Sequence, residues 1–195
     1  MEENTSIVAD ITTSQPTQVL RRKLCDLAQH LDHLANPVNM ALDDLKWHIN
    51  GKIPRSAGWY FIETDTPLEV LKQQHRPQLL YKQKKSGNDA PVKIYDIAGS
   101  AARYSDDLEE FWNTKFVYSG LASNLQTRAR EHTFPDFGTA ALALSLYPEL
   151  RKYQWTFSYV ELQSFLPDVS CQTMLLTLGE QVWRASNGWP LLSRA

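Results

Sequence analysis

The sequence predicts an α+β protein: a small three-stranded antiparallel sheet flanked by helices, with a helical extension before it. Short aromatic and β-branched runs at residues 58–63, 116–120 and 153–162 are typical of buried strands. Apolar residues every three or four positions, as at residues 168–187, predict amphipathic helices. An apolar fraction of 43% and a charged fraction of 22% are those of a globular protein with a real core.

Composition says more about where the protein is found than about what it does. The 195 residues carry a formal net charge of −2, so any surface for a nucleic acid must be local. The first residues, MEENTSIVADITT, are acidic and polar and do not form a signal peptide, and no apolar run is long enough to span a bilayer. Cys25 and Cys171 fall in helical patterns, which favours buried reduced thiols, and a disulfide bridge is compatible with them. We expect a soluble, cytoplasmic protein with no membrane partner.

Residues 1–52 are predicted to be a helical extension of the main domain at residues 53–195. A first amphipathic helix ends near Ala35, and its apolar stripe consists of Leu20, Leu24, Leu27, Leu31 and Leu34. Asn36 and Pro37 are typical of the N-cap and first position of a second helix. Its stripe would be Val38, Leu42, Leu45 and Ile49. Such a pair would pack on the rest of the chain or on a second copy in a homodimer.

The main domain begins with a predicted buried strand at residues 58–63, and a long insert follows at about residues 64–115. Thr66 to Glu69 carry the capping pattern of a brief helix. Residues 105–113 are predicted to form an acidic helix that leads into the second core strand.

The middle of the insert is predicted to be a hairpin. Residues 79–82 and 92–97 would be strands around the turn at residues 86–89. Its basic residues are His75, Arg76, Lys82, Lys84 and Lys85. Lys84 and Lys85 would be either solvated or in contact with a phosphate.

Residues 116–133 contain the clearest local pattern. The aromatic run FVYSG predicts a strand that ends in a tight turn at Gly120. Ser123, with a glutamine three residues later, is a capping-box start for a helix. Arg128 and His132 are four residues apart and share one face of that helix. The unit therefore presents a cation and an imidazole together, as a site for an anionic substrate requires.

Two helices and a strand complete the domain. Residues 139–147 predict a helix of small residues, and residues 153–162 alternate as a strand with one buried face. The last helix is predicted at about residues 168–187. Glu180 and Asn187 would lie two turns apart on one face of it.

These pieces, in this order, resemble the motifs of the GIY-YIG nuclease family. The chain has GWY where the family has GIY, and YSG, at residues 118–120, where it has YIG. Arg128 follows the second motif's glycine by eight residues, as the family arginine does, and His132 matches a histidine of several branches. Glu180 matches the single metal-binding glutamate. The resemblance covers most of the main domain and none of the N-terminal helix pair.

The resemblance implies a one-metal scheme for hydrolysing phosphodiester bonds in DNA. Glu180 would hold Mg²⁺ or Mn²⁺, since Mg²⁺ takes oxygen ligands and keeps most of its waters. Arg128 would offer a planar fork to phosphate oxygens. Tyr60 or Tyr118, with its pKa lowered by the metal and the arginine, would activate or orient water. His132 would assist as a base or bind a phosphate oxygen.

The chain departs from the family pattern in three places. The insert separates two tyrosine motifs that a short loop usually joins, and Asn187 follows Glu180 more closely than usual. Leu121 stands where a lysine is common, and this removes a group that could help to deprotonate the nucleophile. The residues expected to contact the substrate are Arg130, Asn187, Lys84 and Lys85.

Each site residue, taken alone, has a simpler interpretation. Tyr60 and Tyr118 could be core residues, Arg128 part of a solvated helix face, and Glu180 a solvent-facing carboxylate. Their joint order favours a DNA endonuclease, and RNA hydrolysis would need the same residues. The alternative is the same fold kept as an impaired nucleic-acid-binding or protein-interaction module.

Overall fold

A computed structural model describes residues 22, 25–26, 33–82, 89–103, 112–113, 115–136, 139, 141–165 and 172–193. The helices and strands, in chain order, are β1 (Asn36–Asn39), α2 (Trp47–Asn50), β2 (Gly58–Thr64), α3 (Leu68–Lys72), β3 (Leu80–Lys82), β4 (Asp89–Pro91), α4 (Ile97–Ala101), β5 (Trp112–Asn113), β6 (Phe116–Ala122), α5 (Leu125–Thr133), η2 (Leu144–Leu146), η3 (Pro148–Lys152), β7 (Trp155–Glu161), α6 (Leu162–Phe165), α7 (Gln172–Asn187) and β8 (Trp189–Pro190). None of the described helices is long and apolar enough to cross a membrane.

The centre of the protein is a four-stranded antiparallel sheet in the order β1-β7-β2-β6. The α+β class is therefore confirmed, and the sheet has one strand more than predicted. The register places Tyr60 of the central strand β2 opposite Gly120 of β6 and Tyr159 of β7. Strand β6 is at the edge of the sheet, so side chains from both faces can approach it.

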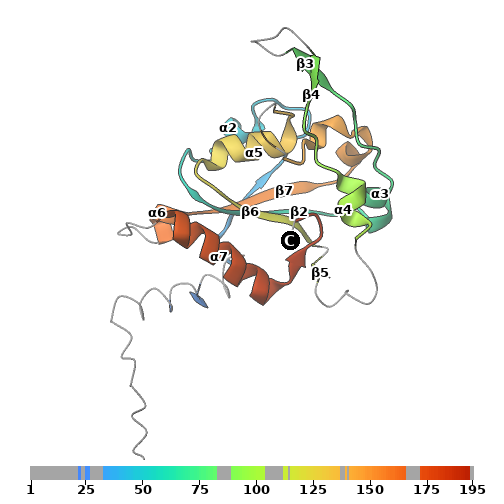
Figure 1. Ribbon diagram of the computed structural model, residues 1–195. Coiled ribbons are helices and arrows are strands. Elements are labelled where there is room, and N and C mark those ends of the chain that lie inside the picture. The colour runs from blue at the N-terminus through green and yellow to red at the C-terminus, as the bar shows by residue number, and fades with distance from the viewer. Residues whose placement is uncertain are drawn as a thin grey trace, which may run out of the picture.

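Helices cover both faces of this sheet (Figure 1). On one face α5 packs over a large apolar cluster that includes Tyr60, Leu125 and Phe157. On the other face α7 packs over a smaller cluster that includes Trp59 and Trp183. The alternation of side chains along β2 thus assigns neighbouring residues of one motif to different faces of the sheet.

The predicted second helix of the N-terminal extension is wrong. Residues 36–39 form strand β1, which pairs with β7 at the edge of the sheet, where a proline at position 37 is tolerated because that edge needs no further donor. Helix α2 has only four residues. Leu45 and Ile49 of the predicted apolar stripe are 69% and 51% exposed, so these residues do not form the buried face of a helix.

The first predicted helix falls largely outside the described residues. Those described within it, at positions 22, 25, 26, 33 and 34, are helical and exposed. Cys25 is an exposed free thiol, contrary to the buried one that we expected, and Cys171 is outside the described residues.

The insert after β2 belongs to the core and is not an appendage. The predicted brief helix is α3, although its N-cap is Pro67 and not Thr66. The predicted hairpin is β3 and β4, which project from the body in Figure 1. Its second strand ends at Pro91, so the predicted strand at residues 92–97 is wrong, and Val92, Ile94 and Tyr95 of that segment are buried before α4 begins. The hairpin turn, with Lys84 and Lys85, and most of the predicted acidic helix lie outside the described residues.

The predicted helix of small residues at 139–147 is also wrong. Its described part contains a three-residue 3-10 turn, η2, and a second one, η3, begins at Pro148. Ala143 has a positive φ of 51°, which a continuing right-handed helix does not allow.

Candidate active site

Three side chains meet at one buried hydroxyl group on the α5 face of the sheet. The Tyr60 hydroxyl lies 2.9 Å from His132 Nε2, and Arg128 Nε donates to the same oxygen at 3.0 Å. Tyr60 is 2% exposed and His132 is fully buried. The predicted pair on α5 therefore does converge, and its common partner is the tyrosine of the first motif.

Helix α5 is held firmly at its start. Asn124, and not the predicted Ser123, is the N-cap, and its side chain accepts a hydrogen bond from the Thr127 amide at 3.0 Å. The amides of Leu125 and Gln126 donate to backbone carbonyls of the loop before β2. All of these first amides are satisfied within the protein, so Arg128 and His132 project from a fixed helix.

The tautomer of His132 follows from its second contact. Its Nδ1 accepts a hydrogen bond from the Leu142 amide at 3.4 Å, so the ring proton is on Nε2 and is donated to Tyr60. The Tyr60 oxygen then accepts from two donors, the imidazole and the guanidinium. Burial, with Arg128 nearby, holds the pKa of His132 well below its usual range, so the imidazole is neutral.

Gly120 is required by this hydroxyl group. A Cβ at position 120 would lie 2.6 Å from Cζ of Tyr60 and closer still to its oxygen. Real Cβ atoms do not approach so closely, so a side chain here would displace the tyrosine. The glycine of the second motif therefore makes room for the tyrosine of the first.

Tyr118 lies beside this cluster. Its ring is nearly parallel to that of Tyr60, with 6.3 Å between centroids, and meets the His132 ring edge-on at 4.7 Å. The positive charge of Arg128 is close enough to act on its hydroxyl group. Burial raises the pKa of both tyrosine hydroxyls, and the opposing effect of Arg128 does not compensate for it. The arginine alone thus does not produce the lowered tyrosine pKa that we expected.

Arg128 has a carboxylate partner that the sequence analysis missed. Its Nη1 lies 2.9 Å from Glu131 Oε2, and both side chains are largely buried. Burial would lower the pKa of Arg128, but Tyr60, Tyr118 and Glu131 outweigh it and raise the pKa, so the guanidinium stays charged. The spacing of three residues on one helix is a signal that could have identified Glu131.

Glu180 approaches from the other face of the sheet, next to β6. Its Oε1 lies 2.5 Å from Arg184 Nη2, and Arg184 in turn hydrogen-bonds to Ser119, the middle residue of the second motif. Burial raises the pKa of Glu180, opposed by Arg184, Ser119 and Arg128. The carboxylate in turn acts electrostatically on both Tyr60 and Tyr118. The charges of Arg128 and Glu180 thus act on the same two tyrosine hydroxyl groups from opposite faces of the sheet.

Helix α7 is placed by aromatic packing. A Cβ on Gly179 would lie 2.6 Å from Nε1 of Trp59, so the helix can approach the sheet only through a glycine at this point. Trp59 donates to the Leu176 carbonyl at 2.8 Å, and Trp183 stacks on Phe61 with 5.4 Å between centroids. These contacts bring Glu180 to Ser119.

The site offers a metal ion one carboxylate ligand, that of Glu180. Within the described ranges, no group of three or more His, Cys, Asp or Glu side chains could hold an ion. Glu180 supplies the oxygen that Mg²⁺ prefers, and Mg²⁺ is often held by one or two carboxylates with water in the other positions. Glu180 therefore fits as such a ligand, with Arg184 bonded to one of its oxygens.

Arg130 and Asn187, two more of the predicted residues, are not part of this cluster. Arg130 points to the other flank of α5 and pairs with Asp136 at 3.2 Å, with both side chains partly exposed. The Asn187 side chain donates to the Trp183 carbonyl at 3.0 Å, at the end of its own helix. Lys84 and Lys85 lie outside the described residues.

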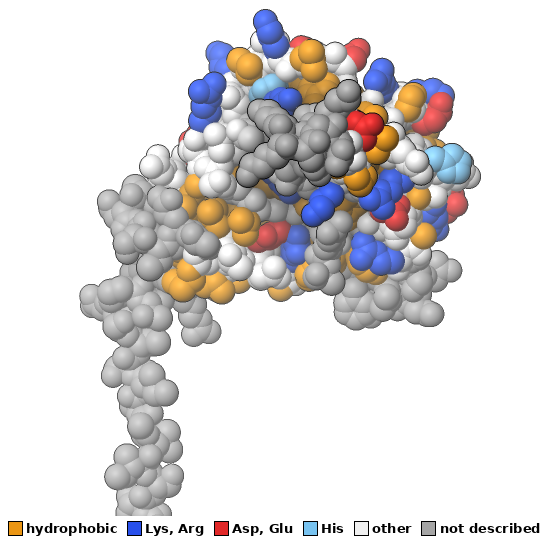
Figure 2. Space-filling view, turned by 45° about the horizontal axis from the view of Figure 1, so that its top comes forward, with side chains coloured by type: hydrophobic (Ala, Val, Ile, Leu, Met, Phe, Trp, Pro, Cys, Tyr) orange, Lys and Arg blue, Asp and Glu red, His pale blue; other side chains and the backbone are white. Residues whose placement is uncertain are grey.

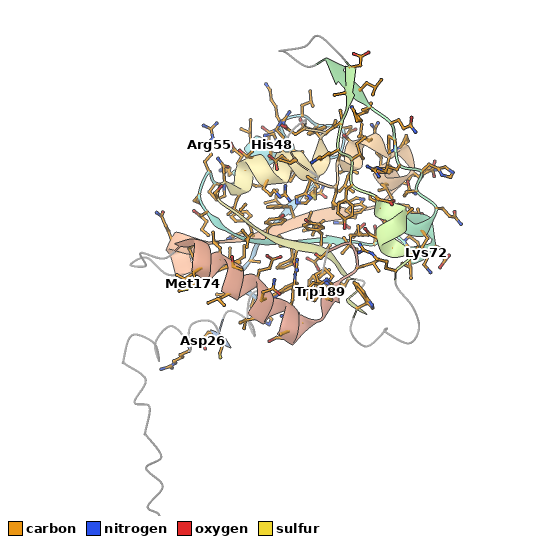
Figure 3. All side chains as sticks on the ribbon, viewed as in Figure 1. Asp26, His48, Arg55, Lys72, Met174 and Trp189 are labelled. Atoms are coloured by element: carbon orange, nitrogen blue, oxygen red, sulfur yellow. The ribbon has the colours of Figure 1, made fainter. Side chains whose placement is uncertain are left out.

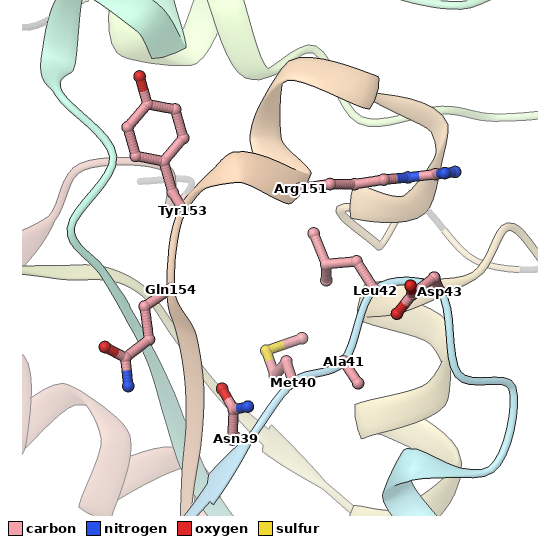
Figure 4. A pocket seen from close by; sticks show the side chains of 8 residues that line it. All are labelled: Asn39, Met40, Ala41, Leu42, Asp43, Arg151, Tyr153 and Gln154. Atoms are coloured by element: carbon pink, nitrogen blue, oxygen red, sulfur yellow. The ribbon is translucent and has the colours of Figure 1, made fainter.

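A cavity of about 400 Å³ opens beside Arg128. It is lined by Leu121, Ala122, Ser123, Asn124, Thr127, Arg128, Glu131 and Leu176. Leu121, Ala122 and Leu176 make part of its wall apolar. A second cavity of about 280 Å³ lies beyond β1, and there Arg151 and Tyr153 extend in different directions and build no common site (Figure 4).

Figure 2 shows basic side chains interspersed with acidic ones on the visible face.

No family model matches the chain, and no curated protein or solved structure matches it significantly.

Proposed function

We propose that the chain is a divalent-metal-dependent endonuclease of the GIY-YIG type that hydrolyses phosphodiester bonds in DNA. The observation that supports this most is the convergence of Arg128 and His132 on the Tyr60 hydroxyl, with Gly120 making room for it. In this proposal β7, β2 and β6 correspond to the three-stranded core of the family, and β1 is an added edge strand.

The residues would divide the chemistry between them. Arg128 uses one N–H group on Tyr60 and one on Glu131, which leaves donors for a phosphate oxygen at the adjacent cavity. A metal held by Glu180 would stabilise charge on the phosphate and on the leaving oxygen.

Tyr60 acts in this proposal as a neutral hydroxyl. Its oxygen accepts from His132 and Arg128, so its own hydrogen is available to orient a water or a phosphate oxygen. Neutral His132 holds the tyrosine oxygen in place. This differs from a phenolate base, which the burial of Tyr60 disfavours.

The second candidate is an impaired module that binds nucleic acid or protein without cleaving. The Glu180–Arg184 ion pair favours it, because a carboxylate already paired with a guanidinium is a poorer metal ligand. Leu121 favours it too, since no lysine follows Gly120.

A nicking assay on supercoiled plasmid with Mg²⁺ or Mn²⁺ separates the two candidates. Wild type should nick, and Arg128→Ala and Glu180→Ala should each lose about 100-fold or more of the rate, the loss typical of one transition-state contact. Arg151→Ala, which removes an exposed arginine far from the cluster, is the control.

Two outcomes would contradict the proposal. Equal rates for wild type and both variants would show that the assignments are wrong. Absence of cleavage by wild type, on DNA and on a labelled RNA run in parallel, together with measurable binding, would establish the impaired module.

A further inference from the structure

The contact between Glu180 and Arg184 is an ion pair that is nearly closed to solvent. The two residues are one turn apart on α7, their atoms approach to 2.5 Å, and their side chains are 11% and 9% exposed. The guanidinium therefore occupies one oxygen of the carboxylate to which we assign the metal.

Arg184 is fixed independently of Glu180. Its Nε donates to the Ser119 hydroxyl at 2.8 Å, and its Nη2 donates to the Ser119 carbonyl at 3.2 Å. Its guanidinium also lies 4.6 Å from the ring centroid of Trp189, which Figure 3 shows just beyond the end of α7. Loss of the contact with Glu180 would therefore leave the cation in place.

A fixed cation and a divalent ion cannot share a carboxylate without cost. Like charges a few ångströms apart repel, and the repulsion is stronger where water is largely excluded. We propose that Arg184 is a positioning residue, and this inference rests on the proposed function, which identifies Glu180 as the metal ligand. It holds the Glu180 carboxylate against β6 and lowers its affinity for a divalent cation, which must displace the guanidinium from Oε1.

A merely structural role for Arg184 makes a different prediction. If the guanidinium only fastens α7 to β6, its removal would loosen the position of Glu180 and weaken metal binding or leave it unchanged. If it competes with the metal, removing its charge would strengthen metal binding. The sign of the change in affinity therefore distinguishes the two roles.

The experiment is calorimetric titration of the full chain with Mn²⁺, without nucleic acid. Arg184→Gln keeps a hydrogen-bonding side chain without the charge, and we expect its dissociation constant to fall about tenfold, equivalent to one pK unit of electrostatic change. Glu180→Gln, alone or with Arg184→Gln, should remove this binding. Arg151→Gln makes the same charge change at an exposed site and should leave the affinity as in wild type.

Unchanged or weaker Mn²⁺ binding by a folded Arg184→Gln would overturn the proposal, and so would an equal gain in Arg151→Gln. Circular dichroism establishes folding. If Arg184→Gln does not fold, Arg184→Met decides, since it keeps an aliphatic stem without the charge: a gain of a few-fold supports competition and no gain overturns it.

This test can fail separately from the proposed function. Nicking by wild type with no gain of Mn²⁺ affinity in either Arg184 variant would refute only the role of Arg184. Tighter, Glu180-dependent Mn²⁺ binding without nicking by any variant would refute only the nuclease.

Discussion

The two sides of edge strand β6 differ in how they hold their polar groups. On the α5 side, Arg128 and His132 donate to one neutral hydroxyl, that of Tyr60. On the α7 side, a carboxylate and a guanidinium neutralise each other as Glu180 and Arg184. Arg128 is also paired with Glu131, so each side holds one cation and one anion, and the two sides differ in the hydrogen-bond donors that stay unused beside a cavity.

This difference shows which side is ready for an anion. Arg128 is paired with Glu131 but retains donors at the cavity, whereas Glu180 can act on a cation only by giving up its bond to Arg184. We therefore expect changes on the α5 side to act directly on catalysis, and changes on the α7 side to act through the metal.

The largest expected effect is that of Tyr60→Phe, which removes the atom on which the α5 side converges. The nicking rate should fall about 100- to 1,000-fold, as for loss of one positioned catalytic group. Tyr159→Phe, at the paired position on β7, is the control.

Stability has to be measured on the same samples. In Tyr60→Phe the buried His132 donor loses its acceptor, which costs about 1–3 kcal/mol, and the partly buried Arg128 loses one of its acceptors as well. A folded Tyr60→Phe with a wild-type rate would remove the α5 side from the mechanism.

Gly120→Ala tests the same hydroxyl from the opposite strand. The new methyl group would overlap the Tyr60 ring, and overpacking of this kind costs about 1–3 kcal/mol of unfolding free energy, measured by urea denaturation. Adding Tyr60→Phe should recover part of the loss, because the closest atom is then absent. Equal stability of Gly120→Ala and wild type would show that the strands adjust and that the glycine is not required by the tyrosine.

The sequence predicted best what lies within one element. The spacing of Arg128 and His132 on a helix, and the aromatic strands at β2 and β7, were predicted correctly because helix and strand periods determine which side chains share a face. Strand β6 was predicted too, but the tight turn expected at Gly120 is wrong, because the strand continues to Ala122 in its pairing with β2. The class α+β followed from the same periods.

Contacts between elements could not be predicted in this way. The spacing of four residues places Arg184 beside Glu180 on the helix. That both lie at Ser119 depends on the packing of Trp59 against Gly179, which the spacing does not reveal. Strand β1 was mistaken for a helix because its pairing with β7, more than 100 residues away, outweighs a local capping pattern. The raised pKa of Tyr60 likewise comes from tertiary burial.

The pH dependence of stability should report the neutral imidazole on the α5 side. His132 has a lower pKa in the folded chain than the usual value of about 6.5, so the unfolded chain binds more protons below that pH. The stability present above pH 6.5 is therefore lost as the pH falls, by up to about 1.4 kcal/mol per pH unit from this group.

The measurement is urea denaturation at pH 7, 6 and 5 for wild type and His132→Gln. The variant should lose less stability over this range. Part of the slope will persist, because burial also lowers the pKa of His48. Identical slopes for the two proteins would mean that His132 is protonated in the folded chain and does not donate as a neutral ring.

The smallest expected effect is that of Arg130→Ala, although Arg130 is on the same helix as Arg128. Arg130 faces away from the cluster and is already paired with partly exposed Asp136, and exposed pairs contribute little. In a fluorescence anisotropy titration with duplex DNA, we expect its dissociation constant to rise about two- to threefold and the salt slope to fall by at most about one, the change for one phosphate contact. Arg128→Ala should weaken binding more than this. A reversed order would place the substrate on the α2 flank of α5, and the comparison between the two sides of β6 would then not describe the site.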